Sequence, residues 1–174
     1  MRTTKRYTNT TFTHRVDHDG GRHRSAKAAS SPRVCAGCRA LYRNKRWTAG
    51  GQGPAPRPLE PAARPAHVLC PACRMGAEGL FSGEVRVSGA FVAEHHAEVE
   101  TLLKREAERA AEDNPTSRIL TLNSPAPDKL CVTTTTEHLA KRLGQALAKA
   151  YQGEVHYGFS HGNKFAHVTW SRTS

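Results

Sequence analysis

The chain has 174 residues, of which only 37% are hydrophobic, and its mean hydropathy is −0.61, so part of it is expected to lack a packed core. No apolar run approaches the roughly 18 residues of a membrane helix, and no apolar stretch follows the first charges, which excludes a membrane span and a secretory signal and favours a cytoplasmic protein. The net charge of +11 is uneven, because residues 1–75 carry +12 and the remainder −1, and this indicates a polyanionic partner for the first part.

Residues 1–32 are rich in threonine, serine, glycine, histidine and arginine, and they contain few large apolar side chains. Such a composition cannot form a core and predicts a flexible basic arm. The histidines of this arm are expected to be solvated and not to bind a second metal. The arm residues expected to contact nucleic acid are Arg15, Arg22, Arg24 and Lys27.

Two Cys-x-x-Cys pairs in residues 33–75 are the strongest chemical signal, and they flank a segment rich in proline and glycine at residues 49–67. The turn within such a pair lets two thiolates converge on one ion, and two pairs complete a closed tetrahedral zinc site. Gly37 is expected to supply the positive φ that a residue near the second cysteine often needs, and Arg39 and Arg74 are expected to offset the thiolate charge. We therefore predict a zinc module over residues 33–75, in which Zn²⁺ is held by Cys35, Cys38, Cys70 and Cys73.

Alternatives to a four-cysteine zinc site stay open. The two pairs could be thiol redox motifs, although these usually sit at a strand-to-helix junction and neither pair is expected there. An iron–sulfur centre and the replacement of one cysteine by His67 are further alternatives. The 31 residues between Cys38 and Cys70 exceed the roughly 15–20 of common zinc modules, and the proline- and glycine-rich insert accounts for the excess.

A basic run with an aromatic residue, Arg43-Asn-Lys-Arg46-Trp47, follows the first cysteine pair. Basic residues beside an exposed aromatic ring can bind phosphate and stack a base. Trp47 could equally pack on the zinc knuckle and substitute for a missing core, and both interpretations stay open. The candidate nucleic-acid residues of the module are Arg33, Arg39, Arg43, Lys45, Arg46, Trp47 and Arg74.

From residue 76 the sequence changes to the pattern of an α+β domain that reaches residue 174. The order β-α-β-β-α-β-β predicts a ferredoxin-like arrangement, in which helices cover one face of a mostly antiparallel sheet. The capping box Thr134-x-x-Glu137 is expected to open the second helix. Cys131 is expected to be a small apolar strand residue rather than a nucleophile, and Trp170 a core residue. The predicted elements are a strand at 83–89, a helix at 90–113, strands at 118–122 and 129–135, a helix that Gly153 ends, and strands at 155–159 and 165–170.

Several short motifs carry a resemblance to known proteins. They are Cys35-x-x-Cys38 with Arg46-Trp47 and Cys70-Pro-x-Cys73, Gly79-x-x-x-Gly83 with Val87-x-Gly89, Thr133 to Thr136 with His138-Leu-Ala and Arg142-Leu-Gly144, and Val168-Thr-Trp170-x-Arg172. Over roughly residues 35–172 the chain resembles an uncharacterised family of small bacterial zinc-ribbon proteins. That family is similar in turn to the export adaptor of the large ribosomal subunit in eukaryotes and archaea. The resemblance implies a zinc-ribbon head that contacts the large ribosomal subunit. The adaptor has more cysteine pairs and carries transport signals, so export is not implied here.

These features together predict a zinc-binding, RNA-binding accessory protein of the ribosome, with RNA, expected to be ribosomal, and ribosomal proteins as partners. Two other functions stay open, namely a zinc-dependent DNA-binding or transcription-linked protein and a thiol redox switch that acts through protein partners. The balanced charge of the predicted helix at 90–113 makes it a poor reader of the major groove. An enzyme is not expected, because the sequence contains no phosphate-binding glycine loop, zinc-protease motif or nucleophile elbow, and no small-molecule substrate is evident.

Overall fold

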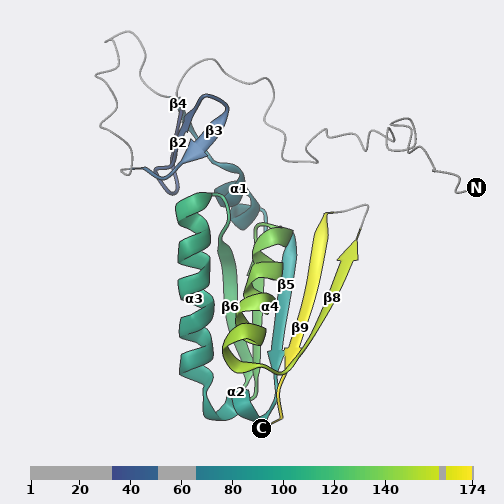
Figure 1. Cartoon of the computed structure of the whole chain (residues 1–174). Helices are drawn as coiled ribbons and strands as arrows, with labels where there is room; N and C mark the ends of the chain where they lie inside the picture. Colours follow the sequence, from purple (N-terminus) through teal and green to yellow (C-terminus); the bar gives the residue numbers. More distant parts are fainter. Residues whose placement is uncertain (1–32, 51–65, 161–163, 174) are drawn as a thin grey trace, which may run out of the picture.

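The computed structural model describes residues 33–50, 66–160 and 164–173 (Figure 1). The predicted basic arm, with Arg15, Arg22, Arg24 and Lys27, lies outside the described residues, as do residues 51–65 of the predicted insert. The described chain forms a small sheet with a short helix and, after it, a larger α+β unit. Figure 1 places the small sheet beyond the end of the larger sheet at which β5 begins and α3 ends.

The small sheet has the strand order β3-β2-β1-β4. Strand β4 runs parallel to β1, and the other neighbours are antiparallel. Asn44 and Lys45 join β2 to β3 with φ angles of 51° and 61°, the left-handed pair that a tight two-residue hairpin turn requires. The elements of this part are β1 (Arg33–Cys35), β2 (Leu41–Arg43), β3 (Arg46–Thr48), β4 (Ala66–Val68) and α1 (Pro71–Ala77).

The larger sheet has the order β6-β7-β5-β9-β8, and α3 and α4 lie side by side over one face of it (Figure 1). The predicted mixed α+β content and the order of elements along the chain are confirmed. The ferredoxin-like arrangement is not confirmed. The last strand, β9, lies between β5 and β8 and runs parallel to β5. The elements are β5 (Gly83–Ser88), α2 (Ala90–Glu94), α3 (His96–Asp113), β6 (Ile119–Ala126), β7 (Lys129–Thr134), α4 (Glu137–Tyr151), β8 (Glu154–Ser160) and β9 (Phe165–Ser171).

Two details of the predicted helices are wrong. The helix expected at 90–113 is broken at His95, whose φ and ψ of −118° and 28° leave the helical region, so that α2 and α3 are separate helices. The N-cap of α4 is Thr136, whose hydroxyl accepts a hydrogen bond from the Leu139 N–H at 3.2 Å. Thr134 instead ends β7, and its hydroxyl donates to the Thr136 carbonyl, which removes it from the capping role that the sequence suggested.

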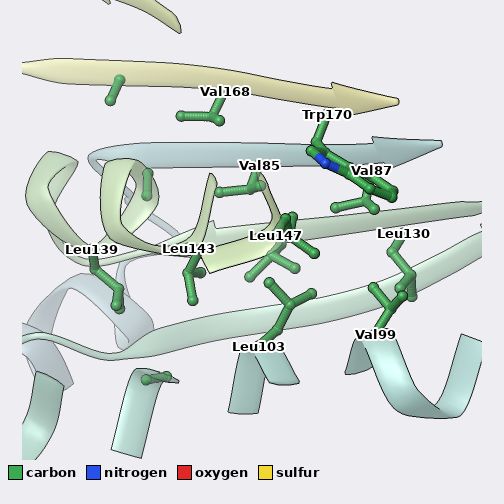
Figure 2. Packing of buried hydrophobic residues seen from close by; sticks show 14 of the residues in the cluster. Val85, Val87, Val99, Leu103, Leu130, Leu139, Leu143, Leu147, Val168 and Trp170 are labelled. Carbon is green, nitrogen blue, oxygen red and sulfur yellow. The ribbon is translucent and has the colours of Figure 1, made fainter. Parts of the chain in front are cut away.

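The core lies between the larger sheet and its two long helices. Alternate residues of the strands are buried on this face, and leucines of α3 and α4 meet them (Figure 2). Trp170 is fully buried, as predicted, and its indole N–H donates to the Gln152 carbonyl at 2.7 Å. Gly144 brings α4 close to β9, since a Cβ at this position would lie 2.6 Å from Val168 Cγ1. The fully buried side chains include Val85, Val87, Val99, Leu103, Leu130, Val132, Leu139, Leu143, Leu147 and Val168.

The opposite face of the larger sheet is polar and includes Cys131. The Cys131 thiol donates to Glu84 Oε1 at 3.6 Å, and Glu84 also bonds to His167 Nδ1 at 2.9 Å and to Arg86 Nε at 3.0 Å. Cys131 lies in strand β7 as expected, and the strand alternation turns its side chain away from the helices and toward these polar groups. Burial raises the pKa of the Cys131 thiol, and the Glu84 carboxylate raises it further, so the thiol stays protonated.

We predict that Leu143→Ala destabilises the α+β unit by about 2–5 kcal/mol, because it leaves a cavity between α4 and the sheet. Equilibrium urea unfolding followed by circular dichroism measures the change. Lys141→Ala, an exposed position on the same helix, is the matched control and should stay within about 0.5 kcal/mol of the native chain. Equal effects of the two substitutions would show that Leu143 is not part of the core.

Candidate metal centre

The four predicted cysteine ligands converge on one point. Their sulfur atoms all lie within 4.8 Å of one another, and the Sγ atoms of Cys38 and Cys70 are 3.6 Å apart. A tetrahedral zinc ion with Zn–S bonds of about 2.3 Å needs sulfur atoms about 3.8 Å apart. The cluster therefore has the size and the donor set that one zinc ion requires.

The first cysteine pair is shaped by the turn between β1 and β2. The Cys35 N–H donates to the Ala40 carbonyl at 2.8 Å, and the Cys38 N–H points to Cys35 Sγ at 3.5 Å. The residue that takes the positive φ is Arg39, at 64°, and not Gly37 as predicted. Gly37 is needed for space instead, because a Cβ there would lie 3.0 Å from Cys73 Sγ.

The second pair lies at the start of α1. Cys70 is the N-cap of this helix, its sulfur accepts from the Cys73 N–H at 3.4 Å, and Pro71 occupies the first turn. The expectation that neither pair sits at a strand-to-helix junction is wrong, since β4 ends at Val68 just before this cap. The Cys70 N–H also donates to Cys35 Sγ at 3.2 Å, which ties the two pairs together. Two independent redox motifs would not need to meet, so the convergence favours a shared metal ion.

The thiol pKa values within the cluster diverge. Burial is the largest influence on Cys35 and opposes its ionisation, but hydrogen bonds from the N–H groups of Cys70 and Cys38 outweigh it and lower the pKa of Cys35 to about 6. Burial raises the pKa of Cys70, and burial together with the neighbouring sulfurs raises that of Cys73. Four crowded sulfurs cannot all ionise without a cation among them, and a divalent ion supplies the charge that stabilises four thiolates.

Arg118 is a residue of this centre that the sequence did not reveal. Its side chain, which belongs to the α+β unit, lies close enough to Cys38, Cys70 and Cys73 to interact with the charge of their sulfurs. Burial lowers the pKa of Arg118, but the interaction with Cys38 and the negative charges of the sulfurs raise it overall. Arg118 is thus a cation close to the sulfur cluster, whereas the predicted counter-charge Arg39 is exposed.

A buried threonine holds Arg118 in place. The Thr135 side chain is 4% exposed, and its hydroxyl accepts from the Arg118 N–H at 2.8 Å and donates to the Thr116 carbonyl at 2.7 Å. The Arg118 Nε donates to the Pro115 carbonyl at 2.5 Å. These bonds connect the segment before β6 to the end of β7. Thr135 therefore fixes the backbone of Arg118, and the Pro115 carbonyl holds its guanidinium. No local sequence pattern marks this residue.

The predicted nucleic-acid residues fall into two groups. Arg33, Trp47 and Arg74 line one hollow together with Tyr42, whose ring centroid is 5.1 Å from that of Trp47. Trp47 also packs against the buried cysteine cluster, so the structural interpretation of this residue is confirmed, while base stacking stays a prediction. His67 lies in β4, but its side chain is outside the described part of the chain. The remaining candidates of the module are exposed and lie apart from the hollow, namely Arg39, Arg43, Lys45 and Arg46.

No protein-family model, curated protein or solved structure matches the chain. Among the described residues, no helix combines the length and the apolar character needed to cross a membrane.

We predict that the purified chain carries one zinc ion and that Cys70→Ser abolishes this stoichiometry, because Cys70 is both a ligand and the cap of α1. Elemental analysis of the reduced protein measures the metal. Cys131→Ser, which removes a thiol outside the cluster, should retain the full zinc content. A metal-free native chain would contradict the assignment.

We predict that Arg118→Gln weakens zinc binding by about 10–100-fold, since partners of metal ligands typically contribute that much to affinity. Competition with a chromophoric chelator measures the affinity. Arg105→Gln, an exposed arginine on α3, should leave it unchanged. Unaltered affinity in Arg118→Gln would show that the guanidinium does not support the thiolates.

Proposed function

We propose that the chain is a zinc-dependent RNA-binding protein that acts as an accessory factor of the ribosome, and that it binds rather than catalyses. The observation that carries the proposal is the uncompensated charge of the zinc module. Residues 33–50 and 66–77 contain no acidic residue, and within the described parts of the chain none of their cations forms an ion pair. The six cations are Arg33, Arg39, Arg43, Lys45, Arg46 and Arg74.

The β2–β3 hairpin concentrates part of this charge at its tip. Arg43 and Arg46 are directly opposite each other across the strands, and Lys45 lies in the turn between them. Like charges in opposed positions destabilise a sheet. A bound polyanion such as an RNA backbone removes this repulsion and releases the counterions of its phosphates.

RNA is favoured over duplex DNA by the shapes available. The long helix α3 has its cations partly paired within the helix, with Lys104 Nζ 2.5 Å from Glu100 and Arg109 2.5 Å from Glu106. A helix of balanced charge gains little from entering the major groove. The small, compact zinc module instead suits the loops and bulges of structured RNA. The ribosome as the source of that RNA rests on the resemblance described above.

A structural role for the metal supports binding over catalysis. Four sulfur ligands fill a tetrahedral site and leave no position for water or substrate. Within this proposal zinc folds the module, and the cations of the module contact phosphates.

We predict that the triple variant Arg43→Gln, Lys45→Gln, Arg46→Gln binds a fragment of large-subunit ribosomal RNA more weakly, with a salt dependence shallower by about 2–3 in the slope of log K against log salt. Fluorescence anisotropy across a salt series measures the slope.

The matched control changes three exposed lysines of the α+β unit, Lys129→Gln, Lys141→Gln and Lys149→Gln, and should keep the native slope. Tighter binding of duplex DNA than of the RNA fragment at equal salt would favour the DNA-binding alternative. Failure to bind RNA at low salt, and sedimentation free of ribosomes, would refute the proposal.

A further inference from the structure

The zinc module has a hollow that is lined by aromatic, apolar and basic side chains. Its volume is about 60 Å³. Tyr42 and Trp47 form its aromatic side, with their ring planes tilted by 49°. Its apolar side is formed by Val68, Leu69 and Pro71.

Two guanidinium groups complete this hollow. The strand register aligns Arg33 with Tyr42, and Tyr42 with Trp47, so these three side chains share one face of the small sheet. Arg74 reaches the same hollow from α1. Neither arginine forms an ion pair with a carboxylate of the described chain, so both can contact an anionic ligand.

We infer that this hollow holds a single unpaired base of an RNA strand, stacked on the Tyr42 ring and in contact with the tilted Trp47 ring, while Arg33 and Arg74 contact the flanking phosphates. The inference rests on the proposed function and adds to it the kind of RNA that is recognised. Aromatic rings beside cations are how proteins bind single-stranded nucleic acid. Leu69 is 38% exposed at this site, and an apolar base face would cover it.

The metal centre assembles the hollow. The aromatic side comes from β2 and β3, which follow the first cysteine pair, and the apolar side comes from β4 and α1, around the second pair. The two sides are joined where the Cys70 N–H meets Cys35 Sγ and where Trp47 packs on the cysteine cluster. Base stacking should therefore require zinc, whereas the attraction of phosphates to exposed cations should persist in part without it.

The experiment compares the zinc-loaded full chain with its Tyr42→Leu variant, which keeps an apolar side chain but removes the ring. The probes are a labelled short RNA oligoadenylate, the same strand annealed to oligouridylate, and the same strand with its bases removed at the central positions. Anisotropy gives each affinity, and the zinc content of the variant confirms that the module is assembled. The native chain should prefer the intact single strand by roughly 5-fold to 100-fold over the abasic one, and Tyr42→Leu should lose most of this preference.

Arg46→Gln is the matched control, because Arg46 lies on the opposite face of β3 from Trp47. It should weaken binding to all three probes alike and keep the preference for the intact strand. If all probes bind equally to the native chain, the stacking site is wrong and the proposed RNA-binding function stands. If no probe binds even at low salt, the proposed function fails first. A groove of tyrosine and tryptophan also suits proline-rich peptides. If such a peptide binds tightly to the native chain without displacing the RNA, the inference is overturned.

Discussion

The rest of the small unit depends on one constraint, the convergence of four sulfur atoms that come from two distant places in the chain. The four strands of the small sheet have three residues each, too few to hold a sheet by themselves. Its buried cluster consists of little more than Cys35, Ala40, Cys70 and Ala72. A cation bound by the four sulfurs would replace the missing hydrophobic core, in the way that small metal-dependent domains generally gain their stability.

The two units of the chain are stabilised by different interactions. The α+β unit buries a continuous layer of valines and leucines between its sheet and α3 and α4, and it needs no ion for this (Figure 2). In the described part of the zinc module, the exposed cations Arg39, Arg43, Lys45 and Arg46 form no ion pair, and the sulfurs occupy the interior. Metal coordination and attachment to a stable neighbour would oppose the repulsion within this positively charged surface.

The sequence was most informative where chemistry is local. A Cys-x-x-Cys pair is recognisable in four residues, and periodicity revealed the long strands and helices that contain Val85, Leu143 and Trp170. It was least informative where function depends on contacts between distant segments. Arg118 comes near the cysteine cluster only through the fold, and the three-residue strands that align Arg33, Tyr42 and Trp47 are too short to show a period. The observed helix boundaries also differ from the predicted ones at single residues, namely at the N-cap Thr136 and at the break at His95.

The position of Arg118 has a mechanical consequence. The zinc module and the α+β unit touch through this guanidinium and through the approach of Leu120 to Gly76 of α1. Oxidation of the sulfurs would remove the negative charge that faces Arg118. The contact between the zinc module and the α+β unit would then weaken at this point, so the state of the cysteines would affect the attachment of the module as well as its folding.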